Sequence, residues 1–282
     1  MEIRRRLKAE LSIFGATFRK ARHDSVNDLA AAIAFWAFFS IFPLLIGILS
    51  LASLILDSGP LQTRIFEAMT DLLPGSEQLV KDNLEAVVRY RGSMGLVAVL
   101  GLFWTASKGF GAITRAINRA LGIRSDLRYV LAKLRQVGMA FAVSILVIVS
   151  LAITVILEVV LEPAFLSRLG MDPVGISRLQ SWAASFLLVF LIFTLIYKLA
   201  PSTKINLEQV LPGALLATIL FELCKIGFVL YLEKAADLKA VYGSLSSIIV
   251  LLLWLYVSAV ILILGAEYSI VRWRSKHETA DS

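Results

Sequence analysis

The chain has 282 residues, of which 58% are hydrophobic and 17% are charged, and its mean hydropathy is +0.80. A typical soluble domain is about half apolar and about one quarter charged, so this composition excludes an ordinary soluble protein. In hydrocarbon every backbone donor and acceptor must be satisfied within the protein. The apolar runs are much longer than the strands of a barrel, so they predict an all-α integral membrane protein.

In chain order, the apolar runs number six, and each is about as long as the 20 residues that a helix needs to cross a bilayer. They lie near residues 29–56, 93–112, 136–161, 181–200, 210–232 and 244–271. The second run is the weakest, because Lys108 falls inside it and its most apolar part, from Met94 to Thr105, is short. The sequence predicts a polytopic bundle of six transmembrane helices within one domain at 29–271.

Basic residues are distributed unequally between alternate loops. Nineteen Lys and Arg residues lie on the side of the two termini, and eight lie on the other side. Cytoplasmic loops carry the excess of Lys and Arg, so both termini are predicted to be cytoplasmic, including the tail at 272–282. The net charge of +7 is mainly this topology signal. Its natural extension is attraction to anionic membrane lipids, and no nucleic-acid partner is expected.

The segment at 1–28 places apolar side chains at helical spacing among basic residues. These are Ile3, Leu7, Leu11, Phe14 and Phe18. The pattern predicts an amphipathic helix that lies in the inner membrane interface. The alternative is a solvated helix whose basic residues only mark the cytoplasmic side of the membrane.

The loop at 57–91 is the longest and is predicted to be external. It is acidic, and its apolar residues recur at helical spacing on either side of Pro74 and Gly75. This pattern predicts a helical hairpin that caps the outer face of the bundle.

Glu222 and Lys225 are the most informative candidates for function, because they lie in the fifth run at i, i+3 on one helical face. Each mid-membrane charge costs about 2.5 to 3.5 kcal/mol on insertion scales, so such groups usually face protein or water. Thr218 lies one turn earlier and extends the polar stripe. The pair either lines a substrate path or is a self-neutralised pair that fixes this helix to a neighbour.

Ser40 and Pro43 lie in the first run, where the proline predicts a kink or a broken helix. Discontinuous helices often surround transporter sites, although kinks also occur in inert bundles.

The second and sixth runs each carry a stripe of candidate substrate-path residues. These are Trp104, Ser107 and Asn118 in the second, and Ser247 and Trp254 in the sixth. The first stripe runs towards a basic loop whose candidates for binding anionic lipid are Arg115, Arg119 and Arg124. Helix packing explains the two stripes equally well, and the excess of Lys and Arg in cytoplasmic loops explains the three arginines equally well.

The sequence lacks the common catalytic constellations. His23 and His277 are the only histidines and both are terminal, and there is no HExxH, P-loop or GxSxG motif. The single cysteine, Cys224, allows neither an intramolecular disulfide nor a cysteine metal cluster. We therefore expect no enzyme, no metal and no cofactor.

Several ordered blocks resemble the YihY/BrkB family of bacterial inner-membrane proteins. They are Ala30–Phe35 with Phe39–Leu44, Trp104–Ser107 with Ala116–Asn118, Tyr197–Pro201 with Leu211–Ala214, and Tyr242–Ser244 through Trp254–Tyr256 to Gly265–Glu267. The blocks together span almost the whole chain.

The resemblance implies a six-span protein of the bacterial inner membrane. Members have been called ribonuclease BN, a label generally regarded as a misassignment, and virulence factor BrkB, from a link to serum resistance. A relative has been proposed to move lipid A precursors. No catalytic residue is implied. The charged pair in the fifth run, the proline in the first run and the lack of a catalytic constellation favour a transporter or a translocase of lipids or anionic solutes. A non-transporting envelope scaffold or assembly factor is the alternative. Substrate identity and homo-oligomer formation stay open.

Overall fold

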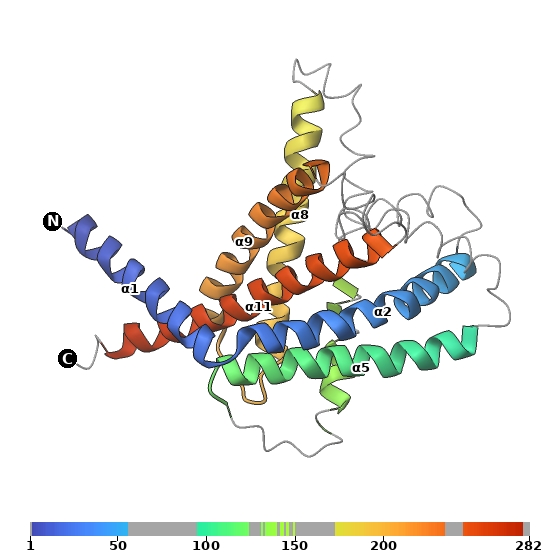
Figure 1. Ribbon diagram of the computed structural model, residues 1–282, viewed down its shortest axis with the longest axis horizontal. Coiled ribbons are helices and arrows are strands. Elements are labelled where there is room, and N and C mark those ends of the chain that lie inside the picture. The colour runs from blue at the N-terminus through green and yellow to red at the C-terminus, as the bar shows by residue number, and fades with distance from the viewer. Residues whose placement is uncertain are drawn as a thin grey trace.

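A computed structural model describes residues 2–55, 95–123, 173–234 and 245–278, and parts of the segment 131–149. Every regular element among these residues is helical. The helices are α1 (Glu2–His23), α2 (Val26–Ile55), α5 (Gly95–Ala120), α8 (Pro173–Leu199), α9 (Leu207–Lys234) and α11 (Ser246–Glu278), as Figure 1 shows. The external hairpin predicted at 57–91 lies outside the described residues.

Three of these helices contain stretches that are long and apolar enough to cross a membrane. They are Trp182–Leu199 in α8, Leu207–Leu232 in α9 and Ser246–Lys276 in α11, and they coincide with the last three predicted spans. The first two predicted spans fall on α2 and α5. In α2, the stretch Val26–Ser40 is apolar but shorter than the three above. The all-α membrane class is confirmed. The six-span count remains a prediction, because the third run is described only in part.

The helix α11 is the centre of the described bundle. It packs against α9 on one side and against α2 on another, while α2 runs along α5 and α8 runs along α9 (Figure 1). Its side chains at Leu251, Ile263 and Ala266 are almost completely buried. The N-terminal helix α1 lies along the C-terminal part of α11, so the two ends of the described chain meet at one end of the bundle.

Small residues allow α9 and α11 to cross closely. Gly213 and Ala217 of α9 face Gly265 of α11, and a Cβ atom added at Gly265 would lie 2.8 Å from the Ala217 Cβ. From α8, the Tyr197 hydroxyl donates a 2.7 Å hydrogen bond to the Leu262 carbonyl. In a membrane the hydrophobic effect does not drive helices together, because lipid tails are as apolar as the side chains. Helices there associate largely through close packing of their backbones over small residues. Three helices are thereby fixed at one point.

The end of α5 is closed by a Schellman motif. Gly122 adopts φ +68°, its N–H bonds the Arg119 carbonyl at 3.0 Å, and the Ile123 N–H bonds the Asn118 carbonyl at 2.8 Å. Glycine suits this left-handed position because it has no Cβ atom. The cap ends α5 sharply beside α1 and fixes the Ala120 carbonyl in place.

Candidate functional site

Glu222 and Lys225 form the ion pair that their spacing predicts. Lys225 Nζ lies 2.9 Å from Glu222 Oε2. The hydroxyl of Ser185, on the neighbouring helix α8, accepts a 3.1 Å hydrogen bond from Lys225 and donates one of 3.1 Å to Glu222 Oε1. Each of the three polar groups therefore has two partners, and the pair joins α8 to α9.

Burial distinguishes the two charged members of this trio. The Glu222 side chain is 7% exposed, whereas the Lys225 side chain is 24% exposed. The flanking residues Leu223 and Ile226 are strongly exposed apolar side chains of α9. The lysine consequently lies at the edge of the seam between α8 and α9, beside a surface that suits lipid.

The ammonium of Lys225 is directed towards the middle of the apolar stretch of α9 and not towards its nearer end. At 1.5 Å per residue, Lys225 lies about 8 Å from the centre of the apolar stretch Leu207–Leu232, towards its C-terminal end. Side chains on a helix point towards its N-terminus, which here is towards the middle of the span. The contact with Glu222, one turn earlier, shows this direction. Snorkelling to the nearer interface is therefore not how the charge is accommodated.

Thr218, the third member of the predicted stripe, is completely buried and donates a 2.8 Å hydrogen bond to the Ala214 carbonyl of its own helix. This i to i−4 bond satisfies the hydroxyl locally.

Trp254 of α11 is buried on another side of α9. Its ring packs against Phe221 at 5.3 Å and Phe228 at 5.0 Å between ring centroids. Ser247, which shares its helix, is half-buried. The structure thus places Trp254 in the packing between α9 and α11.

Ser40 and Trp104 lie where α2 meets α5, and Ser107 is on the same helix as Trp104. The Ser40 hydroxyl bonds the Trp36 carbonyl at 2.7 Å, and the Trp36 ring packs edge-on against Trp104 at 5.9 Å. Ser107 is buried, whereas Trp104 is largely exposed. The helix α2 continues from Val26 to Ile55 through the position of Pro43, whose side chain lies outside the described residues.

Asn118 holds the connection between α8 and α9. Its Nδ2 donates a 2.7 Å hydrogen bond to Ser202 Oγ, and its Oδ1 accepts a 2.8 Å bond from the Ser202 N–H. Arg115 and Arg119, on the same helix, are exposed, and Arg124 lies outside the described residues. The candidates of the second run thus occupy two places, and neither is the α8–α9 seam.

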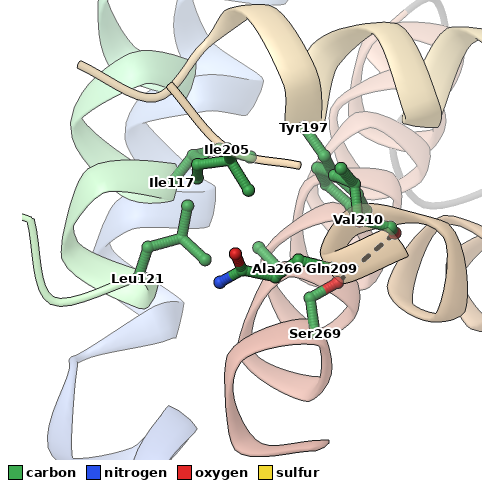
Figure 2. A pocket seen from close by; sticks show the side chains of 8 residues that line it. All are labelled: Ile117, Leu121, Tyr197, Ile205, Gln209, Val210, Ala266 and Ser269. Atoms are coloured by element: carbon green, nitrogen blue, oxygen red, sulfur yellow. Dashed lines mark hydrogen bonds between the residues drawn. The ribbon is translucent and has the colours of Figure 1, made fainter. Parts of the chain in front are cut away.

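A small hollow lies near Asn118, beside Ile117 and Leu121 of the chain. Figure 2 shows its lining side chains, which are Ile117, Leu121, Tyr197, Ile205, Gln209, Val210, Ala266 and Ser269. Its volume of about 10 Å³ is at the lower limit for one water molecule. The lining is almost entirely apolar, and no member of the trio contributes to it. This hollow is too small for a substrate.

A second group of buried charges was not among the sequence candidates. Lys20 of α1 lies 2.7 Å from Glu267 Oε2 of α11 and 2.5 Å from Asp24 Oδ2, and it also donates a 2.7 Å hydrogen bond to the Ala120 carbonyl. Partial burial opposes ionisation of Asp24, but the hydrogen bonds from Lys20 and His23 outweigh it and lower the pKa of this carboxyl. Glu267 is completely buried.

Two signals in the sequence point towards this group. Glu267 is an ionisable residue near the inner end of a long apolar run, and Lys20 belongs to the basic segment before the first run. Their contact could not be read from spacing, because almost the whole chain separates them.

A metal centre is not indicated in the part of the chain that the structure describes. No group of three or more His, Cys, Asp or Glu side chains comes together there. The trio and the Lys20 group both contain a lysine, whose ammonium has no lone pair to offer a metal.

Comparison with known proteins agrees with the class of the fold. The chain is 28% identical to the ribonuclease-like protein YfkH of Bacillus subtilis over 88% of this chain and 90% of that protein. It is 29% identical to the UPF0761 membrane protein VP0125 of Vibrio parahaemolyticus, over 96% of this chain and 85% of the relative. A UPF0761 membrane protein of Alkalilimnicola ehrlichii is 28% identical over 88% of this chain, which spans 55% of that longer relative.

No solved structure matches the chain. The profile of the family described as Virulence factor BrkB matches residues 17–282, which include every helix described above except the start of α1. The chain therefore belongs to the BrkB family of membrane proteins, as its sequence blocks predict.

Proposed function

We propose that this protein is a transporter that moves an anionic lipid, or another anionic amphiphilic solute, across the bacterial inner membrane. The observation that carries the proposal is the Lys225 ammonium, which lies within an apolar helix and is partly uncovered at the seam between α8 and α9. Ionisable residues inside membrane spans are costly and commonly mark substrate paths. Apolar residues would fill the same seam without that cost.

The chemistry of the trio suits an anionic headgroup. A phosphate oxygen can replace Glu222 or Ser185 as the partner of Lys225, since both supply an oxygen at hydrogen-bond distance. The acyl chains would meanwhile lie against the exposed apolar residues Leu223 and Ile226 of α9. Lys225 would thus lower the barrier for a headgroup midway through the bilayer.

The surroundings of the path agree with this substrate class. Arg115 and Arg119 are exposed on α5, and basic residues near a membrane surface attract anionic lipid by about 1 kcal/mol each. The neighbouring positions of α1 and the end of α11 support an even number of crossings, with both ends on one side. The excess of basic residues on that side supports a cytoplasmic location for it.

The test is lipid movement in vesicles that contain the purified full chain. Phosphatidylcholine vesicles receive a trace of fluorescent phosphatidylglycerol, and an impermeant reductant bleaches the label in the outer leaflet. The wild-type protein is expected to make the protected inner pool accessible, and Lys225→Met is expected to slow this step by at least tenfold. Lys204→Met, which removes an exposed loop lysine, is the matched control and should keep the wild-type rate.

The proposal fails if wild-type vesicles bleach like empty ones, or if Lys225→Met and Lys204→Met behave alike. A parallel series with fluorescent phosphatidylcholine tests the charge preference. Equal rates for the two lipids would contradict an anionic substrate.

A scaffold or assembly factor is the second candidate, because each group of the trio has two partners within it. Such a mutually bonded trio also suits a purely structural link between two helices. In that case Glu222→Gln with Lys225→Met would preserve the cellular phenotype, and the exposed apolar face of α9 could serve a second copy of the chain. A transporter would lose its phenotype in the same double variant.

A further inference from the structure

Asp24 and Glu267 share one ammonium group in a region closed by three helices. The Lys20 ammonium has three N–H donors and three oxygen neighbours, on Asp24, on Glu267 and on the Ala120 carbonyl. None of its donors is left for the second oxygen of Glu267. Among the described residues, both carboxylate oxygens of Glu267 are completely buried without a hydrogen bond, and only Oε2 has Lys20 Nζ as an ion-pair neighbour, at 2.7 Å.

The charges of this group do not balance. Two ionised carboxylates and one ammonium carry a net charge of −1, and the Glu267 side chain is 0% exposed. An isolated charge in such surroundings is so costly that the group usually becomes neutral instead. The Ala120 carbonyl, at the negative end of α5, adds to the negative potential.

The remaining charged neighbours do not restore the balance. His23 contacts Asp24 at 3.2 Å, but its side chain is 87% exposed. Asp28 of α2 and Arg119 of α5 are also exposed. Arg274 of α11 lies beside Gly122, at the end of the α5 cap. The group needs one more positive charge, and its orphan oxygen is the place where that charge can bind.

We propose that Glu267 is a proton-binding site, and that the bound proton secures α1 against α11. Asp24 stays ionised, because it has Lys20 and His23 as partners and stands just before the positive N-terminal end of α2. Glu267 takes up the proton from water, and the neutral carboxyl can remain buried. Loss of the proton leaves an unbalanced charge between α1 and α11 and weakens their contact. This site does not depend on what the trio in α9 transports.

The test is infrared difference spectroscopy of the purified full chain, titrated from acid to alkaline pH. A carboxylic acid and a carboxylate absorb at separate frequencies, so the proton is observed directly. A protonated carboxyl band is expected at neutral pH in the wild-type protein and not in Glu267→Gln. Glu208→Gln is the matched control, because Glu208 is exposed, and it should retain the band.

Two further variants test the charge balance. Lys20→Met removes the only ammonium in the group, so the midpoint of the band should move to higher pH by about 1–3 units. Asp24→Asn leaves Glu267 alone with Lys20, so the midpoint should move to lower pH. A purely structural glutamate with no bound proton would show neither shift.

The proposal is overturned if the wild-type protein lacks the band at neutral pH, or if Glu267→Gln retains it. It is also overturned if sodium chloride, compared with choline chloride, raises the melting temperature of the wild-type protein and not of Glu267→Gln. That result would assign the missing positive charge to a metal cation. Folding of each variant is checked by size-exclusion chromatography before titration.

Discussion

Gly265 and Gly213 lie so close together that a Cβ atom added at Gly265 would be 2.8 Å from the Gly213 carbonyl oxygen. The Tyr197 hydroxyl and the Ala217 Cβ occupy the remaining space around Gly265. The crossing of α9 and α11 therefore has no room for even one methyl group. The helix α8 depends on the same point through Tyr197.

Alanine at either glycine should destabilise the protein. Gly213→Ala and Gly265→Ala each force the backbones of α9 and α11 apart, at a cost of about 1–3 kcal/mol. Gly227→Ala, in α9 like Gly213, is the control. A Cβ atom at Gly227 meets nothing within 4 Å, and alanine favours a helix. Thermal unfolding in detergent measures the difference. Equal melting temperatures for Gly265→Ala and Gly227→Ala would contradict the tight crossing.

The trio should respond to single and double substitution in different ways. Glu222→Gln or Lys225→Met leaves one charge without its partner, and breaking a buried pair costs about 3–5 kcal/mol. The partial exposure of Lys225 places Glu222→Gln at the lower end of this range, because lipid headgroups or water can reach the remaining ammonium. The double variant should recover much of the lost stability.

A double-mutant cycle on melting temperature, together with the cellular phenotype, separates the two roles of the pair. Recovery of stability without recovery of phenotype indicates a working site, and recovery of both reduces the pair to structure. If neither single change alters either quantity, the pair is not the centre of this protein. Ser185→Ala should weaken the coupling energy, since its hydroxyl bonds both partners.

The clamp between Asn118 and Ser202 should stabilise the connection from α8 to α9. Asn118→Ala removes both of its hydrogen bonds to the half-buried Ser202, at a cost of about 1–3 kcal/mol. Asn27→Ala, at an exposed position, is the control. Proteolysis between α8 and α9 should accelerate in Asn118→Ala alone. An unchanged cleavage rate would show that the clamp is dispensable.

The topology is tested by single cysteines in a Cys224→Ser background and an impermeant thiol reagent. Cysteines at Gln78 and Met171 should be labelled from outside in intact cells, and a cysteine at Thr203 should be labelled only after lysis. Thr203 is chosen because it is exposed, whereas its neighbour Ser202 is held by Asn118. Reversed labelling, or labelling that requires an odd number of crossings, would overturn the six-span prediction.

The helices and the pair in α9 were predictable because both depend on local spacing. Apolar runs specify where α8, α9 and α11 cross hydrocarbon, and the i, i+3 relation of Glu222 and Lys225 places them on one face whatever surrounds them. Contacts between helices were not predictable in this way. Ser185 is one of many serines, and only the packing of α8 on α9 makes it a partner of both charges.

The distribution of the other candidates shows the same limit. Asn118 continues a polar stripe in the sequence, and the stripe does not reveal that its amide bonds Ser202 in the loop between α8 and α9. The Tyr197 hydroxyl bonds the backbone carbonyl of Leu262. Every residue has such a carbonyl, so the sequence does not identify this partner. A helical wheel gives the direction in which a side chain points, but it does not identify the residue of a neighbouring helix that lies in that direction.

The contact between Lys20 and Glu267 also has a consequence for biosynthesis. Lys20 is synthesised well before Glu267, because most of the sequence lies between them. Until α11 has been inserted, α1 lacks its partner in the ion pair and the Glu10 carboxylate lacks Arg272, its 3.1 Å neighbour. A truncated chain that ends before α11 would thus display an undocked N-terminal helix, which distinguishes it from the finished protein for any protease that surveys the membrane.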